Sequence, residues 1–276
     1  MLCFNGNDKI IFKSKTKNII EEKYNFKIIN IKKNEKSTDK NVYNLFTDKN
    51  EYILKIYNSK KHVENMSNLF KKLEQYNFYI PQIYNTIDNK SYIYLFNKYI
   101  IIYSYLAGKE IGEAFSNLPD DISVLLARKL KKFHDVTKKN LNLEVIGLGN
   151  KKLRTSILHF DLTRSNIFYN KNKNEIGFID FDDAKYGQTI IDISILIVNV
   201  YISKLRGIDI HGIKTFINEY YKNESELKKQ ELPLIKDTAI KWINKILSEN
   251  KLETSTIDSL EIRKKLISKI DFCDFN

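Results

Sequence analysis

The apolar residues of this 276-residue chain follow two different periods, and the change between them lies near Gly108. Before it, from about Phe26 to Tyr105, short runs rich in Ile, Tyr, Phe and Val are bounded by Asn, Asp and Lys, which is typical of antiparallel strands. After it, apolar residues recur about every 3.6 positions, as in amphipathic helices. The pattern predicts an α+β fold, with an N-terminal antiparallel sheet and a mainly helical C-terminal half. The expected helical segments are 120–136, 190–205, 212–221 and 232–248.

In the first half, the runs VYNLFT and YILKIYN flank the turn Asp48-Lys49-Asn50 and predict a hairpin. Apolar residues at helical spacing between positions 60 and 76 predict one helix that packs on the sheet. The boundary between the halves has no linker rich in Pro, Gly or Ser. We therefore expect two lobes, 1–103 and 104–276, that share a cleft.

The composition excludes several classes of protein. With 42% hydrophobic and 29% charged residues and only 3 Pro and 9 Gly, the chain is expected to fold and not to be disordered or fibrous. Because only Cys3 and Cys273 are present, we expect neither a disulfide framework nor a C-x-x-C metal cluster, and a cytoplasmic location. We see no secretory leader, and polar residues interrupt the longest apolar stretches, so no membrane partner is expected.

The net charge of +12 would suit a nucleic-acid or anionic-membrane partner, but the lysines are spread along the whole chain. We find no basic cluster with interleaved aromatic residues and no recognised nucleic-acid-binding module. We interpret the charge mainly as a solvated surface, and nucleic-acid binding remains a minor alternative.

The stretch HFDLTRSNIFYNKNKNEIGFIDFDD, residues 159–183, concentrates acidic and amide side chains between apolar runs. The runs IFY and IGFI are separated by NKNKNE, which predicts a second hairpin. The start of one strand of a hairpin lies beside the end of the other, so Asn166 and Asp180 should meet, and Asp161 can fold back onto them. An amide oxygen and a carboxylate suit Mg²⁺. The free carboxylate of Asp161 would then accept a proton from a hydroxyl that attacks a phosphate.

The spacing H-x-D-x-x-x-x-N, followed by a strand pair and D-F-x, resembles the catalytic and metal-binding loops of protein-kinase-like phosphotransferases. More closely, His159-Phe160-Asp161 and the run from Ile179 to Asp192 resemble the aminoglycoside phosphotransferase and choline kinase family. The typical pattern there is H-G-D-x-x-x-x-N, then I-D-[WF]-x-x-A and a later Asp. The resemblance covers about residues 26–248. It implies a bilobal kinase-like fold and the transfer of the γ-phosphoryl group of ATP or GTP to a hydroxyl of a small molecule, with Mg²⁺.

The resemblance also implies roles for the motif residues. Asp161 would be the catalytic base, and Asn166 and Asp180 would be ligands of Mg²⁺. Asp182 would contact a second metal ion, although an exposed loop carboxylate is an equal alternative. Any one of these residues alone is explained by the frequency of Asp and Asn in turns, but their joint spacing is not.

Two further positions are implied to support the catalytic loop. His159 would hold the loop through hydrogen bonds, and Asp192 would bind the loop from the start of the next helix, a plain helix N-cap being the alternative for Asp192. Phe160 stands where the family commonly has Gly, and we expect its bulk to alter the acceptor pocket.

In the first lobe, strand alternation turns Lys55 to the face opposite its apolar neighbours, and the resemblance implies contact with the nucleotide phosphates. The alternative is an exposed edge-strand lysine. Glu64 is a candidate ion-pair partner of Lys55, although its position on the helical wheel does not secure the pairing. The hinge residues Ser104, Tyr105 and Leu106 would hold the purine through backbone groups.

The acceptor must be bound by the helical lobe, and the sequence does not identify it. A polycationic aminoglycoside would need an acidic cleft, whereas choline, homoserine, a sugar or a macrolide would need a different pocket. A kinase-shaped protein that binds without catalysis is a further alternative. Candidates for an acidic cleft, equally explained by a solvated helix surface, are Glu110, Glu113, Asp120, Asp121, Glu219, Glu224, Glu226 and Glu231.

Overall fold

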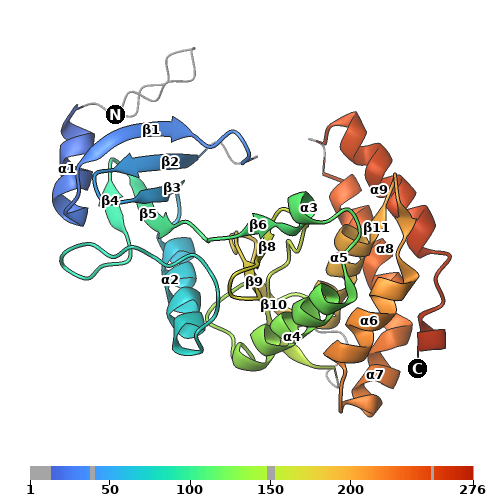
Figure 1. Ribbon diagram of the computed structural model, residues 1–276. Coiled ribbons are helices and arrows are strands. Elements are labelled where there is room, and N and C mark those ends of the chain that lie inside the picture. Colours follow the sequence, from blue (N-terminus) through green and yellow to red (C-terminus); the bar gives the residue numbers. More distant parts are fainter. Residues whose placement is uncertain (1–13, 38–40, 148–152, 250–251, 276) are drawn as a thin grey trace. The chain divides into compact units, whose positions relative to one another are not determined.

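The computed structural model describes residues 14–37, 41–147, 153–249 and 252–275 (Figure 1). The chain divides into two compact units, the first up to Leu106 and the second from Ala107 onward. By the family resemblance we also expect residues 34–41 to cover the nucleotide phosphates, and this segment lies partly outside the described residues, at 38–40. None of the described helices is long and apolar enough to cross a membrane.

The first unit is built on a five-stranded antiparallel sheet in the order β1-β2-β3-β5-β4. The expected hairpin is formed by β2 and β3, and Thr47 closes its turn, since its Oγ1 donates to Asn50 O at 2.7 Å and accepts from Asn50 N at 3.0 Å. The strands are β1 (Ile28–Lys33), β2 (Val42–Thr47), β3 (Glu51–Tyr57), β4 (Ile93–Leu95) and β5 (Lys98–Ser104).

The two faces of this sheet pack against different helices. On one face, Leu54 and Ile102 belong to a buried cluster with Ile20 of α1 (Ser14–Tyr24), a helix that the sequence did not predict. On the other face lies the predicted helix α2 (Lys60–Gln75), where the rings of Phe70 and Tyr103 lie 5.3 Å apart. Residues of one strand alternate between faces, so Lys55 lies on the α2 face.

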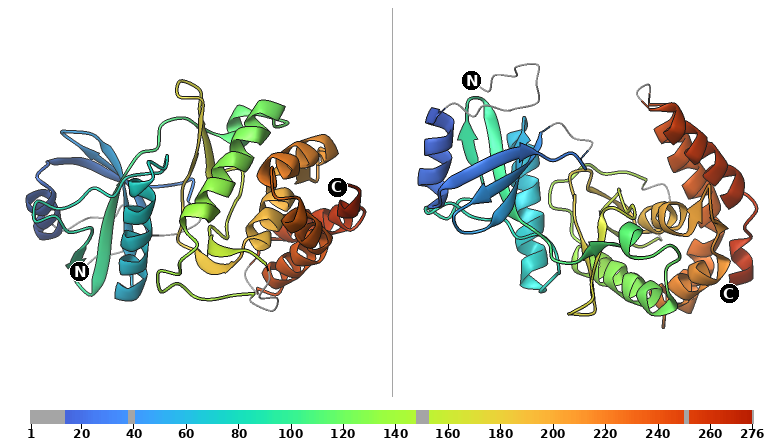
Figure 2. Two further views of the ribbon diagram at one scale, coloured as in Figure 1. Left: turned by 90° about the horizontal axis from the view of Figure 1, so that it is seen from below. Right: turned by 45° about the horizontal axis from the view of Figure 1, so that its top comes forward.

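The second unit is mainly helical, with short strand pairs at its start (Figures 1 and 2). The three-stranded sheet β6-β8-β9 contains the expected hairpin of β8 (Ile167–Asn170) and β9 (Glu175–Phe178). The remaining elements are β6 (Lys109–Glu110), α3 (Ile111–Ala114), α4 (Asp120–Val136), β7 (Thr155–Leu158), β10 (Lys185–Gln188), α5 (Ile190–Leu196), the π-helical η1 (Ile197–Tyr201), β11 (Ile202–Ser203), β12 (Gly207–Ile208), α6 (Ile210–Tyr220), α7 (Ser225–Glu231), the 3₁₀ turn η2 (Leu232–Leu234), α8 (Ile235–Leu247), α9 (Thr254–Ile267) and the 3₁₀ turn η3 (Phe272–Phe275).

The helices of the second unit pack on one another and bury apolar side chains between them. Helices α4 and α6 pack on each other, α5 packs on α8, and α8 lies beside α9 in both figures. Leu126, Phe133, Ile193 and Phe216 are fully buried there. Complete burial of such a side chain contributes about 1.5–3 kcal/mol to the free energy of folding. The buried side chains therefore stabilise the framework from which the loops of the second unit project.

One expected helix ends earlier than its apolar pattern predicts. The segment 190–205 is α-helical only as far as Leu196, continues as the π-helical η1, and turns into β11 at Ile202. Ile202 then pairs with Ile208 across the turn 204–206, and Gly207, the first residue of β12 (Gly207–Ile208), has φ +74°. The apolar period cannot show this end, because a buried strand and a buried helix both present an unbroken apolar run.

Candidate active site

The β8–β9 hairpin positions Asn166 and Asp180, which lie at its open end. Ile167 pairs with Phe178, and the next backbone contact outward is Ile179 N donating to Asn166 O at 3.0 Å. Asn166 therefore lies across from Ile179, the residue that precedes Asp180. The hairpin brings together two polar residues that the sequence separates by a whole strand pair.

Asp161 folds back onto Asn166. The Asn166 Nδ2 donates to Asp161 Oδ2 at 2.7 Å and to the Asp161 backbone O at 3.0 Å. The loop between them is closed by two backbone hydrogen bonds, from Thr163 N to Asp161 O at 3.0 Å and from Asn166 N to Thr163 O at 3.1 Å. Since Nδ2 faces Asp161, the amide oxygen of Asn166 is the atom that would remain for a metal ion.

The carboxylates near this point influence one another. Burial raises the pKa of Asp161, and the nearby charges of Asp180 and Asp183 raise it further, whereas His159 and the hydrogen bond from Asn166 lower it. Three acidic side chains therefore lie within electrostatic range of one another. Asp183 was given no role by the sequence motif, and only its spatial neighbourhood shows its influence.

Asp192 holds the backbone of the predicted catalytic loop, residues 159–166. It is fully buried in the first turn of α5, and its two oxygens accept from consecutive backbone N–H groups, those of His159 at 2.7 Å and Phe160 at 2.8 Å. Its Oδ2 also lies 3.1 Å from His134 Nε2. These bonds span from α5 to the loop, whereas the alternative, a helix N-cap, would bond within the first turn of α5.

His159 links the same loop to the hairpin. Its Nε2 lies 2.8 Å from the backbone O of Ile179, and its ring contacts the buried Phe181 with centroids 4.6 Å apart. His159 is itself fully buried. The backbone on either side of the site is thus held by hydrogen bonds to buried side chains.

The donor set fits Mg²⁺. Asn166 and Asp180 offer oxygen atoms, and a divalent cation would offset the repulsion that raises the pKa of Asp161. Among the described residues no group of three or more His, Cys, Asp or Glu side chains could hold a metal ion by themselves. Mg²⁺ in phosphoryl-transfer sites is held by one or two protein ligands, and water and phosphate oxygens complete its coordination. Asp182 is half-buried, and its contact with a second metal stays a prediction.

Two residues of this region have backbones that favour glycine or asparagine. Phe160 has φ +68° and Asp180 has φ +62°. The position where the family commonly has Gly therefore has a left-handed backbone in this chain, although Phe occupies it. The Phe160 ring lies 5.2 Å from Lys245 Nζ of α8, so its side chain contacts a helix of the second unit.

The predicted nucleotide residues all lie in the first unit. Lys55 is half-buried between the buried Leu54 and Ile56, as alternation predicts. The proposed pairing with Glu64 is not formed, because Glu64 is exposed at the start of α2 and makes its ion pair with Lys60 at 3.4 Å. The helical spacing i,i+4 favours this local partner over a partner on the sheet.

The expected hinge follows the end of β5. Ser104 N donates to Gln82 O at 2.8 Å, and Gln82 N donates to Ser104 Oγ at 2.9 Å, so the backbone N–H of Ser104 is already engaged. Tyr105 donates through its hydroxyl to Asn44 Oδ1 at 2.8 Å, and Leu106 is buried. Purine binding at this segment stays a prediction for the backbone groups of Tyr105 and Leu106.

A comparison with protein families matches the segment that contains these motifs. Residues 139–213 match the phosphotransferase enzyme family, APH. The resemblance seen in the sequence is thereby confirmed for the segment that carries the catalytic loop, the β8–β9 hairpin and Asp192. No curated protein matches the chain in sequence.

Solved structures of phosphotransferases share the fold over nearly the whole chain. The amicoumacin kinase hAmiN, solved in complex with AMP-PNP, Ca²⁺ and Ami, is 18% identical, with a TM-score of 0.70 and 96% of each chain covered. The spectinomycin phosphotransferase APH(9)-Ia, solved with ADP and spectinomycin, is 14% identical, with a TM-score of 0.59 and coverage of 97% of this chain and 98% of the other. The choline kinase LicA from Streptococcus pneumoniae is 11% identical, with a TM-score of 0.54 and coverage of 93% and 100%. The predicted bilobal, protein-kinase-like α+β fold is confirmed.

Proposed function

We propose that this protein is a phosphotransferase that moves the γ-phosphoryl group of ATP or GTP to a hydroxyl of a small molecule, with Mg²⁺. The observation that carries the proposal is the convergence of Asp161, Asn166 and Asp180 at the open end of the β8–β9 hairpin. The phosphotransferase family match includes all three residues. A nucleotide donor also agrees with the AMP-PNP and ADP in the complexes of similar fold. Because such a donor is abundant in the cytoplasm, we propose that the protein acts there.

In this proposal the three residues have separate tasks. Mg²⁺, held by Asn166 Oδ1 and the Asp180 carboxylate, would neutralise charge on the transferred phosphate. Asp161 would accept the proton of the acceptor hydroxyl. The hydroxyl oxygen of the acceptor forms a bond to the γ-phosphorus as the bond from this phosphorus to the leaving nucleoside diphosphate breaks. The hydrogen bond of 2.7 Å from Asn166 Nδ2 to Asp161 Oδ2 fixes the orientation of the Asp161 carboxylate. His159 and Asp192 position the loop without contacting the reacting atoms.

Replacement of the base tests this division of tasks. Asp161→Ala is expected to abolish transfer of labelled γ-phosphate to an acceptor, because no other group then takes the hydroxyl proton. The variant should still bind Mg-ATP in isothermal titration, since the base acts on the acceptor and not on the nucleotide. A screen of aminoglycosides, macrolides, choline, homoserine and sugars supplies the acceptor. Unchanged phosphorylation by Asp161→Ala would refute the role of Asp161.

A kinase-shaped binding protein without catalysis is favoured by one observation, the pairing of Glu64 with Lys60 in place of Lys55. In protein-kinase-like enzymes an acidic partner positions the lysine on the phosphates. This second candidate predicts nucleotide-dependent thermal stabilisation with no phosphoryl transfer to any acceptor in the same screen.

A further inference from the structure

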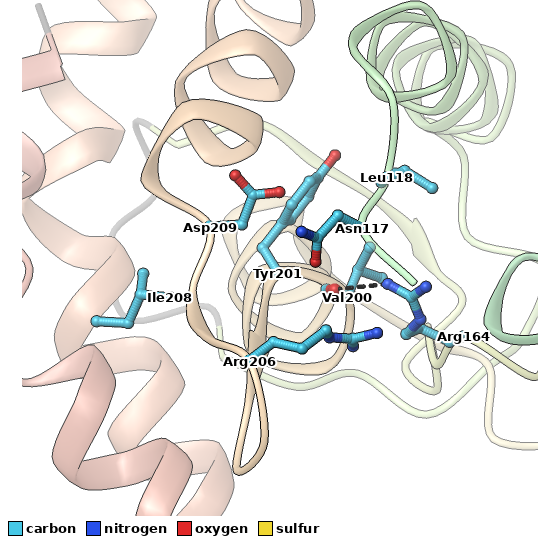
Figure 3. A pocket seen from close by; sticks show the side chains of 8 residues that line it. All are labelled: Asn117, Leu118, Arg164, Val200, Tyr201, Arg206, Ile208 and Asp209. Carbon is cyan, nitrogen blue, oxygen red and sulfur yellow. Dashed lines mark hydrogen bonds between the residues drawn. The ribbon is translucent and has the colours of Figure 1, made fainter. Parts of the chain in front are cut away.

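The second unit contains a cavity of about 180 Å³ next to the catalytic loop (Figure 3). Its walls come from the segment before α4, the catalytic loop, the end of the π-helical η1 and the β11–β12 hairpin. Arg164 belongs to the catalytic loop and Arg206 to the turn of the β11–β12 hairpin, and both lie in the lower part of Figure 3. The other lining residues are Asn117, Leu118, Val200, Tyr201, Ile208 and Asp209.

The guanidinium group of Arg164 is held in place by backbone carbonyls. Its Nη1 donates to Val200 O at 3.1 Å, and its Nη2 donates to Ile111 O at 3.2 Å, to Ser116 O at 3.3 Å and to Phe115 O. Burial lowers the pKa of Arg164, and the nearby charge of Arg206 lowers it further. Arg164 is thus a fixed cation that the fold brings close to a second cation.

A third arginine lies in the same electrostatic neighbourhood. Arg206 donates to the backbone O of Ser116, the carbonyl that also accepts from Arg164. Burial lowers the pKa of Arg263 of α9, again with a contribution from Arg206, and its buried Nε has no hydrogen-bond partner. Within the described part of the chain, none of the three arginines forms an ion pair with a carboxylate. Bringing like charges together costs free energy that a bound anion would offset.

The acid on the cavity wall already has a structural task. Asp209 is the N-cap of α6 and accepts from Gly212 N at 2.8 Å. The lining side chains therefore contribute two positive charges against one negative charge. Each planar guanidinium group can donate parallel hydrogen bonds that fit the two oxygens of a carboxylate. The excess of positive charge would repel a cationic ligand.

Four of the eight acidic residues that would suit a polycationic acceptor are engaged in contacts within the fold. Glu219 pairs with Arg128 at 2.6 Å, and Glu224 pairs with Lys131 at 2.5 Å and with Arg154. Asp120 lies 2.8 Å from His211 Nε2. Glu231 is fully buried and accepts from the hydroxyl of Tyr221 at 2.6 Å. These contacts join elements of the fold, so these four carboxylates already have partners.

We propose that the cavity binds the carboxylate of the acceptor through Arg164 and Arg206, so that the substrate class is hydroxyl compounds that carry a carboxylate. The proposal rests on the proposed function for the transfer step. Arg164 follows Asp161 by three residues in one loop, so their Cα atoms lie at most roughly 11 Å apart. In this proposal the acceptor is a small hydroxy acid or hydroxy amino acid, with its hydroxyl at Asp161 and its carboxylate in the cavity.

A binding experiment tests the cavity independently of turnover. We would compare the thermal unfolding midpoint in sodium acetate and in sodium chloride of equal ionic strength for the unmodified protein, Arg206→Gln and the control Lys204→Gln. Lys204 lies in the same exposed turn but does not line the cavity. Acetate should raise the midpoint of the unmodified protein and of Lys204→Gln by a few degrees relative to chloride, and this shift should be lost in Arg206→Gln. An equal acetate shift in all three proteins, or none, would overturn the proposal.

A kinetic experiment tests the acceptor class. 4-Hydroxybutanoate, L-serine and L-homoserine would be compared with their neutral carboxamides and with an aminoglycoside. Hydrogen bonds to an ionised carboxylate are stronger than those to a neutral amide, so the acids should have kcat/KM at least tenfold above their amides, and Arg206→Gln should remove this difference through KM. Equal rates for acids and amides, or transfer to the aminoglycoside alone, would refute the acceptor class and leave the phosphotransferase function standing. Failure of every acceptor, together with no Mg-ATP binding, would refute the function itself, and the acetate experiment alone would then decide whether the cavity binds carboxylates.

Discussion

At the scale of single residues, the catalytic loop depends on conformations that most side chains avoid. Phe160 and Asp180 have φ values of +68° and +62°, which cost about 1–2 kcal/mol each for residues other than glycine. At Phe160 this turn of the backbone directs consecutive N–H groups toward the buried Asp192. Strain of this kind persists where surrounding contacts fix it, and it is frequent at functional sites. The sequence motif identified both positions but not their backbone conformation.

Asp192 offers a direct test of how the loop is held. Asp192→Ala should lower stability by about 1–3 kcal/mol for each buried donor left without an acceptor, those donors being the N–H groups of His159 and Phe160 and the Nε2–H of His134. The thermal unfolding midpoint should fall by several degrees. The control Asp121→Ala removes an exposed carboxylate from the first turn of α4 and should change the midpoint little. If both variants melted together with the unmodified protein, Asp192 would not hold the loop.

At the scale of elements, the sequence predicted those with a strong period and missed those without one. Helices α2 and α4 and the β2–β3 and β8–β9 hairpins agree with their patterns, because amphipathic spacing and turn residues mark them clearly. Helix α9 buries Leu260 and Ile267 among many polar residues, which leaves too weak a period for prediction. The sequence pattern does not distinguish the π-helical η1 from a continuation of the α-helix before it, because its apolar residues suit either kind of helix.

The helices of the second unit are joined by a buried polar chain that the sequence does not show. His134 of α4 is fully buried between Tyr220 of α6, whose hydroxyl lies 2.6 Å from Nδ1, and Asp192 of α5, 3.1 Å from Nε2. Burial lowers the pKa of His134 despite the opposing effect of Asp192, so the ring is neutral at pH 7. Nε2–H then donates to Asp192, and Nδ1 accepts from the Tyr220 hydroxyl.

This neutral histidine makes stability depend on pH. The folded-state pKa lies below the unfolded value of about 6.5, so the unfolded state binds a proton first and stability is lost as pH falls below about 6.5. The loss approaches 1.4 kcal/mol per pH unit until the folded-state pKa is reached. His134→Gln should flatten the fall of the unfolding midpoint between pH 7.5 and 5.5.

The exposed His211 provides a control of opposite sign. Its hydrogen bond and charge interaction with Asp120 raise its pKa, so its contribution to stability is present at low pH and lost as pH rises through that raised pKa. His211→Gln should therefore make the fall on acidification steeper. The same pH dependence in His134→Gln and the unmodified protein would show that His134 is not buried in the neutral form.

At the scale of the whole molecule, the two units differ in how much of their function the sequence could predict. The candidate site of the second unit comes from one continuous segment, residues 159–192, so the spacing of its polar residues could be recognised as a sequence motif. The cavity that contains Arg164 and Arg206 combines segments far apart in the sequence, and only the fold brings them together. In the first unit, the strand period placed Lys55 correctly on a half-buried face, while the helical wheel did not locate its acidic partner.

The central claim is that Asn166 and Asp180, brought together by one hairpin, bind the metal of a metal-bound nucleotide. Isothermal titration of Mg-ATP into the unmodified protein and into Asp180→Ala tests it most directly. Asn174→Ala, in the exposed turn of the same hairpin, serves as the control for damage to the fold. We predict that the unmodified protein and Asn174→Ala bind Mg-ATP, and that Asp180→Ala binds it at least tenfold more weakly. Undiminished Mg-ATP affinity in Asp180→Ala would contradict the claim.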